Sequence, residues 1–309
     1  MKTRIGVKDL FVTGERRLNL LWQLLLYLLS WWVIFVLSAV PATVLALLLR
    51  WPASYQNAVF AVFAIPALIG WTYVYRRWID RRPWAGIGLT HLSAGLPQLG
   101  AGFLVGTVMV AAWLLLDSAL GWVRFVGDEP TTSGPLSALG FVLVGLAANA
   151  GAGFLEEIGY RGYVLQNLGR RFPLRAAVPL SSLLFAIVVH FNKLTPFLAA
   201  VAIVVGVLLA LTRLLTGAIW FAIGLHWSFD GTQTYLFGLG DMSPPYHHSL
   251  IHLQAQGYLT GVDGQDPMEL AVACVAVGLG LLWLHRARRL DWGARLDDDG
   301  RPALARPER

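Results

Sequence analysis

The chain has 309 residues, of which 56% are hydrophobic and only 14% are charged, and it contains 13 Trp. This balance excludes an ordinary soluble domain, in which about a quarter of the residues are charged. The net charge is +6, but no motif combines aromatic and basic residues as nucleic-acid binding proteins do, so we expect no nucleic-acid partner. The single cysteine, Cys274, excludes an internal disulfide.

Apolar runs near the length of a membrane crossing recur along the chain. A hydrocarbon core about 30 Å thick is crossed by about 20 helical residues. Eight such runs occur, at residues 18–49, 58–74, 96–116, 136–155, 176–189, 197–211, 218–236 and 270–284. The first is too long for one simple span, and we expect Pro41 to break or kink it into a membrane part and an interfacial part. The pattern predicts an all-α, polytopic integral membrane bundle of about eight transmembrane helices.

The distribution of basic residues agrees with an even number of spans. If the N-terminus lies inside, only Arg50, Arg124 and Lys193 fall in outer loops, which leaves 21 of the 24 Lys and Arg residues on the inner side. Because basic residues accumulate in cytoplasmic loops, both termini are predicted to be cytoplasmic. The preference for Arg over Lys favours a GC-rich bacterial genome and hence a bacterial inner (plasma) membrane.

The domain organisation follows from the same runs. We expect residues 1–290 to form one integral membrane domain and residues 291–309 to be a charged, disordered cytoplasmic tail. No internal repeat and no separate soluble domain is visible. His247, His248 and His252 fall in an outer loop, which is either a polar loop or a peripheral metal site.

The most informative residues lie at the end of the fourth run. Glu156 and Glu157 are adjacent, and Arg161 follows four residues later. A central charge in a membrane helix costs about 2.5 to 3.5 kcal/mol on insertion scales, so three within six residues indicate chemistry. On a helix Glu157 and Arg161 can pair on one face, whereas Glu156 points about 100° away and stays free for a reacting group.

Two later spans carry further polar residues, namely His190 and the pair His226 and Asp230. If the chain turns near residues 172–173, Glu156 and His190 both stand about 24 to 27 Å from the turn, at a rise of about 1.5 Å per residue. They can therefore share a level in the membrane. His226 enters from the same side and can approach it.

Each of these features also has a purely structural interpretation. Glu157 with Arg161 could be a buried ion pair, His190 a packed histidine, and His226 with Asp230 a hydrogen bond between helices. Their joint occurrence on three spans favours a site, because ionisable groups in membranes face bundle interiors or watery cavities.

Residues 136–235 resemble the CAAX prenyl endopeptidase and bacteriocin-immunity family of intramembrane proteases. The motif Glu-Glu-x-x-x-Arg is matched by Glu156, Glu157 and Arg161, with Gly162 and Tyr163 continuing it. A second motif, an aromatic residue four positions before a histidine, is matched at His190, but Ala186 stands at the aromatic position and Phe185 one residue earlier. The third, His-x-x-x-Asn or Asp, is matched by His226 and Asp230.

The resemblance implies a peptidase in which Glu156 acts as general base on a water that His190 also holds, and His226 donates to the oxyanion. Asp230 would either orient His226 or, if protonated, donate to the oxyanion itself. A second version places Zn²⁺ on Glu156, His190 and His226, with water as the fourth ligand. The sequence leaves the zinc and metal-free versions open.

The leading function is therefore an intramembrane endopeptidase that cleaves a membrane-associated protein or peptide, with the lipid bilayer as its surroundings. The alternative is a noncatalytic membrane protein of the same fold, serving in bacteriocin self-immunity or partner binding. A proton-coupled transporter would use the same carboxylates as a relay, but the sequence shows no inverted repeat.

Overall fold

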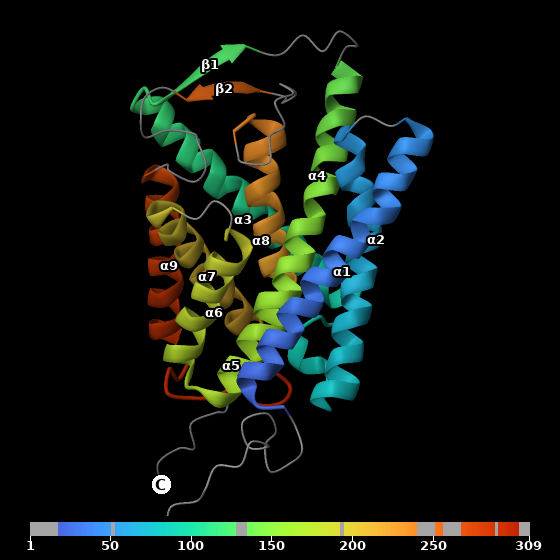
Figure 1. Cartoon of the computed structure of the whole chain (residues 1–309). Helices are drawn as coiled ribbons and strands as arrows, with labels where there is room; N and C mark the ends of the chain where they lie inside the picture. The colour runs from blue at the N-terminus through green and yellow to red at the C-terminus, as the bar shows by residue number, and fades with distance from the viewer. Residues whose placement is uncertain are drawn as a thin grey trace, which may run out of the picture.

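The computed structural model describes residues 18–50, 53–127, 135–191, 195–239, 251–255, 267–287 and 290–302. Its elements are α1 (Leu20–Leu49), α2 (Ala53–Val74), η2 (Tyr75–Asp80), η3 (Trp84–Ile87), α3 (Leu92–Ala119), β1 (Val123–Gly127), α4 (Pro135–Glu157), η4 (Ile158–Val164), α5 (Leu165–Arg171), α6 (Leu174–Val189), α7 (Pro196–Thr216), α8 (Trp220–Gly231), η5 (Thr232–Leu236), β2 (His252–Ala255) and α9 (Pro267–Ala287). The segments η2, η4 and η5 are π-helical, and η3 is a 3₁₀ helix. The long helices lie side by side in one bundle (Figure 1).

The prediction of an all-α polytopic membrane bundle is confirmed. Six of the described helical stretches are long and apolar enough to cross a membrane: Leu20–Leu49, Gln56–Asp80, Trp84–Ala119, Val142–Arg171, Pro196–Thr216 and Pro267–Arg286. The other two expected spans correspond to α6, of 16 residues, and to α8, of 12 residues followed by η5. These two helices are shorter than a simple crossing requires.

The expected break of the first apolar run at Pro41 is wrong, because α1 continues through Pro41 as one helix of 30 residues. Proline removes one backbone hydrogen bond, but within a membrane any non-helical alternative would expose several more backbone groups to lipid. A single missing bond is the smaller penalty.

The helices differ in how deeply they are buried. Within an apolar stretch of 18 residues, 56% is buried in the span containing α4 and 61% in α7. The corresponding share is only 11% in α1 and 17% in α9. The exposed residues of α1 are mainly leucine and valine, as a lipid-facing surface requires. The polar residues predicted to form the site lie on helices toward the middle of the bundle.

Glycines allow α3 and α8 to pack closely. A Cβ atom added at Gly102 would overlap the carbonyl oxygen of Phe221, and one added at Gly224 would overlap that of Leu99. In membranes, where water does not drive helices together, such small residues permit the close contacts that hold helices together. Nothing lies within 4 Å of a Cβ added at Gly100, on the same helix α3.

We predict that Gly224→Ala lowers the free energy of unfolding by about 1 to 3 kcal/mol, because the added methyl group must separate α8 from α3. Gly100→Ala is the matched control and should be neutral or stabilising, since alanine favours helix. Unfolding in detergent micelles measures both. Equal stability of the two variants would contradict the close packing.

The two ends of the bundle differ. At one end β1 and β2 form a two-stranded antiparallel sheet that joins two segments far apart in the chain. The start of α1 and residues 290–302 lie at the opposite end (Figure 1). The sequence did not predict the sheet.

Within the segment predicted as a disordered C-terminal tail, residues 291–302 pack against the bundle. Leu296 is 6% exposed, and its N–H donates to the carbonyl of Gly169 at 2.8 Å. The carboxylate of Asp298 lies 2.7 Å from Arg82 and 2.8 Å from Arg170. A charged composition suggested disorder, but the charge of Asp298 is paired and one apolar side chain is buried. Residues 303–309 of the predicted tail lie outside the described part of the chain.

We predict that Leu296→Ala releases this segment, because truncating a buried leucine typically costs about 2 to 5 kcal/mol. Hydrogen exchange at the amide of residue 296 should accelerate strongly in this variant. Arg295→Ala, at the neighbouring exposed position, is the control and should leave that protection unchanged. Rapid exchange at Leu296 in the unmodified protein would contradict the docked arrangement.

Candidate functional site

The buried carboxylate of Glu157 is the centre of the polar cluster. Glu157 ends α4 with a fully buried side chain, and its Oε1 accepts a hydrogen bond from Nη1 of Arg161 at 2.8 Å. The same Oε1 lies 2.8 Å from Nδ1 of His226 on α8. A carboxylate paired with arginine only accepts, so Nδ1 of His226 carries the hydrogen in this contact. Glu157 thus fixes both a guanidinium and an imidazole.

The second ring nitrogen of His226 faces the two other acidic residues. Its Nε2 lies 3.3 Å from Oδ2 of Asp230 and 3.7 Å from Oε2 of Glu156. The side chains of Glu156 and Asp230 are 17% and 32% exposed, whereas that of Glu157 is 0% exposed. The accessible edge of the cluster is therefore formed by Glu156, Asp230 and Nε2 of His226.

Phe185 on α6 packs against the other side of the cluster. The guanidinium of Arg161 lies 4.2 Å from the centre of the Phe185 ring, a cation–π contact. The same ring is nearly perpendicular to those of His190 and His226, at centroid distances of 6.0 and 6.1 Å. Phe185 is thus a residue of the site that the sequence motif did not identify, because it stands one residue before the position at which the motif expects an aromatic residue.

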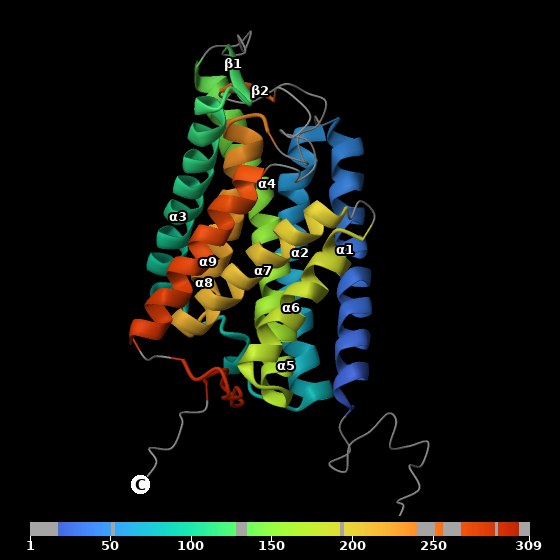
Figure 2. The same cartoon turned by 90° about the vertical axis from the view of Figure 1, so that its left-hand side faces the viewer.

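His190 lies just past the end of α6, where the backbone leaves helical geometry (φ −106°, ψ 19°). Figures 1 and 2 show that α6 ends and α7 begins well short of the end of the bundle that carries β1 and β2. The structure therefore places His190 within the height of the bundle, beside Phe185. Polar contacts join Glu156, Glu157, Arg161, His226 and Asp230 into one network. His190 lies next to this network, because the Phe185 ring contacts the rings of both His190 and His226.

The close approach of α4 and α8 brings the acidic pair to His226. A Cβ atom added at Gly153, one turn before Glu156 and Glu157, would lie 3.0 Å from Cβ of Trp227 and 3.1 Å from the carbonyl of Ile223. Immediately after Glu157 the chain enters the π-helical segment η4, which carries Arg161. π-Helical segments are rare in proteins, and those that occur are often found at functional sites.

Two buried polar groups beside the network make no hydrogen bond to the residues that the structure describes. They are Oε2 of Glu157 and the side-chain amide of Asn149, which is 1% exposed. Buried polar atoms without partners are uncommon in folded proteins.

Zinc bound by Glu156, His190 and His226 stays a prediction. Within the described part of the chain no three His, Cys, Asp or Glu side chains gather as a metal site. Nδ1 of His226 is engaged by Glu157 and Nε2 contacts Asp230, so zinc bound by Glu156, His190 and His226 would have to replace the contact with Asp230. His247 and His248 lie outside the described residues, as does the side chain of His252.

The fold and the cluster define a class: a polytopic helical membrane protein with an acid and imidazole network inside its bundle. Residues 138–232 match the family model described as type II CAAX prenyl endopeptidase Rce1-like. This match confirms the resemblance to the CAAX prenyl endopeptidase family that the motifs predicted, over the segment from α4 to the start of η5. No curated protein and no solved structure gives a significant match to the chain.

We predict that Glu157→Gln lowers the yield of folded protein and destabilises it by about 3 to 5 kcal/mol, because it leaves Arg161 buried without its carboxylate. Glu156→Gln, the neighbouring isosteric change, should fold normally, since no Arg161 contact depends on it. Detergent unfolding curves compare the two variants. Equal stability would contradict the central position of Glu157.

Proposed function

We propose that this protein is an intramembrane endopeptidase that hydrolyses a peptide bond of a membrane-associated protein or peptide through a water activated by Glu156. The observation that carries the proposal is that the two adjacent glutamates differ in their burial and in their contacts. Glu157 is fully buried and bound to Arg161, whereas Glu156 is accessible and lies 3.7 Å from Nε2 of His226. The family match at residues 138–232 supports the same activity.

The hydrolysis can be assigned to these side chains. Glu156 takes a proton from water as the oxygen attacks the carbonyl carbon, and it later returns that proton to the leaving amine. His226, as an imidazolium whose Nδ1–H is held by Glu157, presents Nε2–H to the oxyanion that forms on the carbonyl oxygen. His190, beside Phe185, helps to hold the attacking water. Glu157 and Arg161 act as positioning residues, since they fix the imidazole without facing the accessible edge.

Asp230 is the hydrogen-bond partner of His226 before substrate binds. Its Oδ2 lies 3.3 Å from Nε2, the nitrogen assigned to the oxyanion. An ionised Asp230 accepts from Nε2–H before substrate binds and keeps the imidazole oriented along this direction. The substrate's developing oxyanion then replaces this carboxylate as the acceptor.

For the base, we predict that Glu156→Gln lowers peptidase activity by about 10²-fold or more, because general base catalysis contributes about 10²- to 10⁴-fold. The unfolding curve should remain unchanged. The measurement is cleavage of a quenched peptide library by purified protein, with Asp299→Asn, an exposed acid in the C-terminal segment, as the control. Near-normal turnover of the Glu156 variant would overturn the mechanism.

For Asp230, we predict that Asp230→Asn lowers activity, since an amide is a weaker acceptor for the imidazole N–H than a carboxylate. The pH profile of cleavage is the second readout. A fully active variant with a flattened alkaline limb would show instead that Asp230 is a protonated donor to the oxyanion.

Zinc bound by Glu156, His190 and His226 is the second version of this chemistry, and elemental analysis separates the two. In the metal-free mechanism active protein contains far less than one zinc per chain, and chelators leave cleavage unchanged. One zinc per chain that is lost in both His190→Ala and His226→Ala would establish the zinc version.

The setting proposed for this activity is the plasma membrane of a bacterium, with both termini in the cytoplasm. The start of α1, residues 290–302 and the arginines that follow α2 share one end of the bundle, as the basic-residue distribution requires. A purified protein that binds membrane partners but cleaves no peptide would favour the noncatalytic alternative, self-immunity or partner binding.

A further inference from the structure

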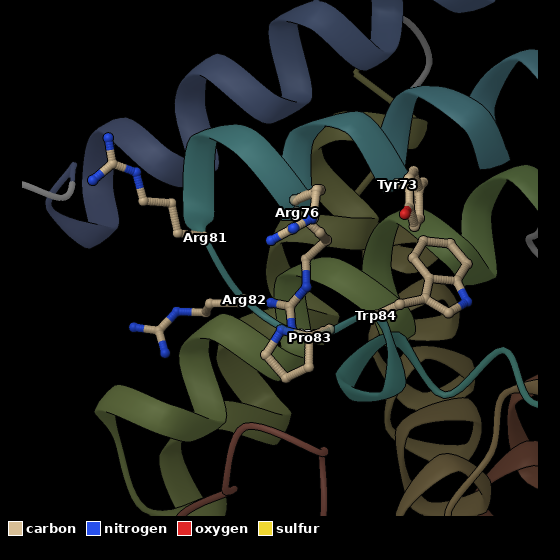
Figure 3. Close-up of a pocket in the computed structure, with 7 residues that line it drawn as sticks. Tyr73, Arg76, Arg81, Arg82, Pro83 and Trp84 are labelled. Atoms are coloured by element: carbon tan, nitrogen blue, oxygen red, sulfur yellow. Dashed lines mark hydrogen bonds between the residues drawn. The ribbon is translucent and has the colours of Figure 1, made fainter.

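A basic pocket lies at the end of the span formed by α2 and η2. It has a volume of about 360 Å³ and lies between the end of η2 and the start of η3 (Figure 3). Its lining residues are Tyr73, Arg76, Arg77, Arg81, Arg82, Pro83 and Trp84. None of them belongs to the cluster around Glu157, so the pocket is a separate feature.

Arg76 supplies a buried positive charge at this pocket. Its side chain is 1% exposed, and Nη2 donates to the carbonyl of Pro83 at 2.8 Å. Its Nε and Nη1 make no hydrogen bond to the residues that the structure describes, and the carboxylate of Asp80 is 3.9 Å away. Oδ1 of Asp80 also accepts from the hydroxyl of Tyr163 at 3.0 Å. Arg76 is therefore incompletely neutralised, and an anion nearby would offset its burial.

The rim provides further donors. Arg77 and Arg81 are exposed, and neither forms an ion pair within the described part of the chain. Arg81 has a left-handed backbone (φ 56°) that ends η2, and Figure 3 shows its side chain extending away from Tyr73 and Trp84. Arg82 is paired with Asp298 at 2.7 Å. Among the described residues, the four arginines of the pocket thus outnumber the two carboxylates that contact them, Asp80 and Asp298, which leaves an excess of positive charge there.

The surroundings of the pocket are those of a membrane–water boundary. The rings of Tyr73 and Trp84 pack edge to face at 5.8 Å, and Trp78 and Ile79 of η2 are 63% and 36% exposed. Tryptophan and tyrosine concentrate at the level of lipid headgroups. A molecule bound in the pocket would therefore meet arginines together with the rings of Tyr73 and Trp84, which also line it.

We propose that this pocket binds the phosphate group of an anionic phospholipid. Arginine guanidinium groups match phosphate oxygens with paired hydrogen bonds, and basic pockets at the ends of membrane helices bind anionic headgroups. The positive charge of a choline headgroup would be repelled by the excess of arginines. The rings of Tyr73 and Trp84, which line the pocket, favour a lipid over free phosphate, because only a lipid brings acyl chains to them.

The test is thermal unfolding of delipidated full-length protein in micelles, titrated with short-chain phosphatidylglycerol. Saturable stabilisation is expected, and Arg77→Gln with Arg81→Gln should weaken the apparent affinity by about 10-fold or more, since each guanidinium removed takes away a charge-assisted contact. Arg77→Lys with Arg81→Lys should be intermediate, because this variant keeps the charge but loses the forked geometry.

The matched control is Arg171→Gln with Arg175→Gln, two exposed arginines at the same end of the bundle that do not line the pocket. That variant carries the same change in charge. It should shift the affinity less than about 2-fold, because exposed charges outside the pocket act only through a screened field.

Three results would overturn the proposal. Equal weakening in both glutamine double variants would mean that only the general surface charge attracts lipid. Equal stabilisation by phosphatidylcholine would remove the selectivity for an anionic headgroup. Stabilisation by inorganic phosphate or glycerol phosphate at the same concentrations would assign the pocket to a soluble anion. All variants lie on exposed side chains, and the single change Arg81→Gln is the fallback if a double variant folds poorly.

Discussion

The contact on which the rest of the site depends is the shared oxygen of Glu157, which accepts from Arg161 and from His226. A charge taken out of water is stable only if it is paired and hydrogen-bonded, and this carboxylate has two partners on one atom. Its burial therefore fixes the side of α4 that faces α8. It also sets which nitrogen of His226 is held and which one faces outward. Glu156, one residue earlier, is left at the accessible edge because the helix turns it away.

Close helix packing makes this arrangement possible. Gly153 brings α4 against α8, and the glycines between α3 and α8 hold the opposite side of α8 in place. In lipid there is little hydrophobic force between helices, so association relies on close packing and polar contacts. The polar network and the small residues thus act together: the glycines bring the backbones close, and the buried charges select one rotation of each helix.

The end of the bundle at which α1 starts is held by charges of a different kind. Asp298 contacts Arg82, next to the basic pocket, and Arg170 on α5, which continues from the segment carrying Arg161. Exposed ion pairs contribute little individually, typically about 0 to 1 kcal/mol. Here they accompany the buried Leu296 and the backbone hydrogen bonds that join residues 292–296 to α5 and to the start of α6. The C-terminal segment consequently ties together the elements that carry the pocket and the site.

The sequence by itself determined the membrane class, the helical bundle and the residues of the polar cluster, because hydropathy and buried charges leave few alternatives in lipid. It also predicted the ion pair between Glu157 and Arg161, because residues four apart on a helix lie on neighbouring turns. The partnership of Glu157 with His226, 69 residues away, came only from tertiary packing, which sets the rotation of α4 against α8. Phe185, the docked residues 290–302 and the pocket around Arg76 likewise depend on contacts between distant segments. Local patterns of composition and spacing do not encode such contacts, because they arise where separate helices meet.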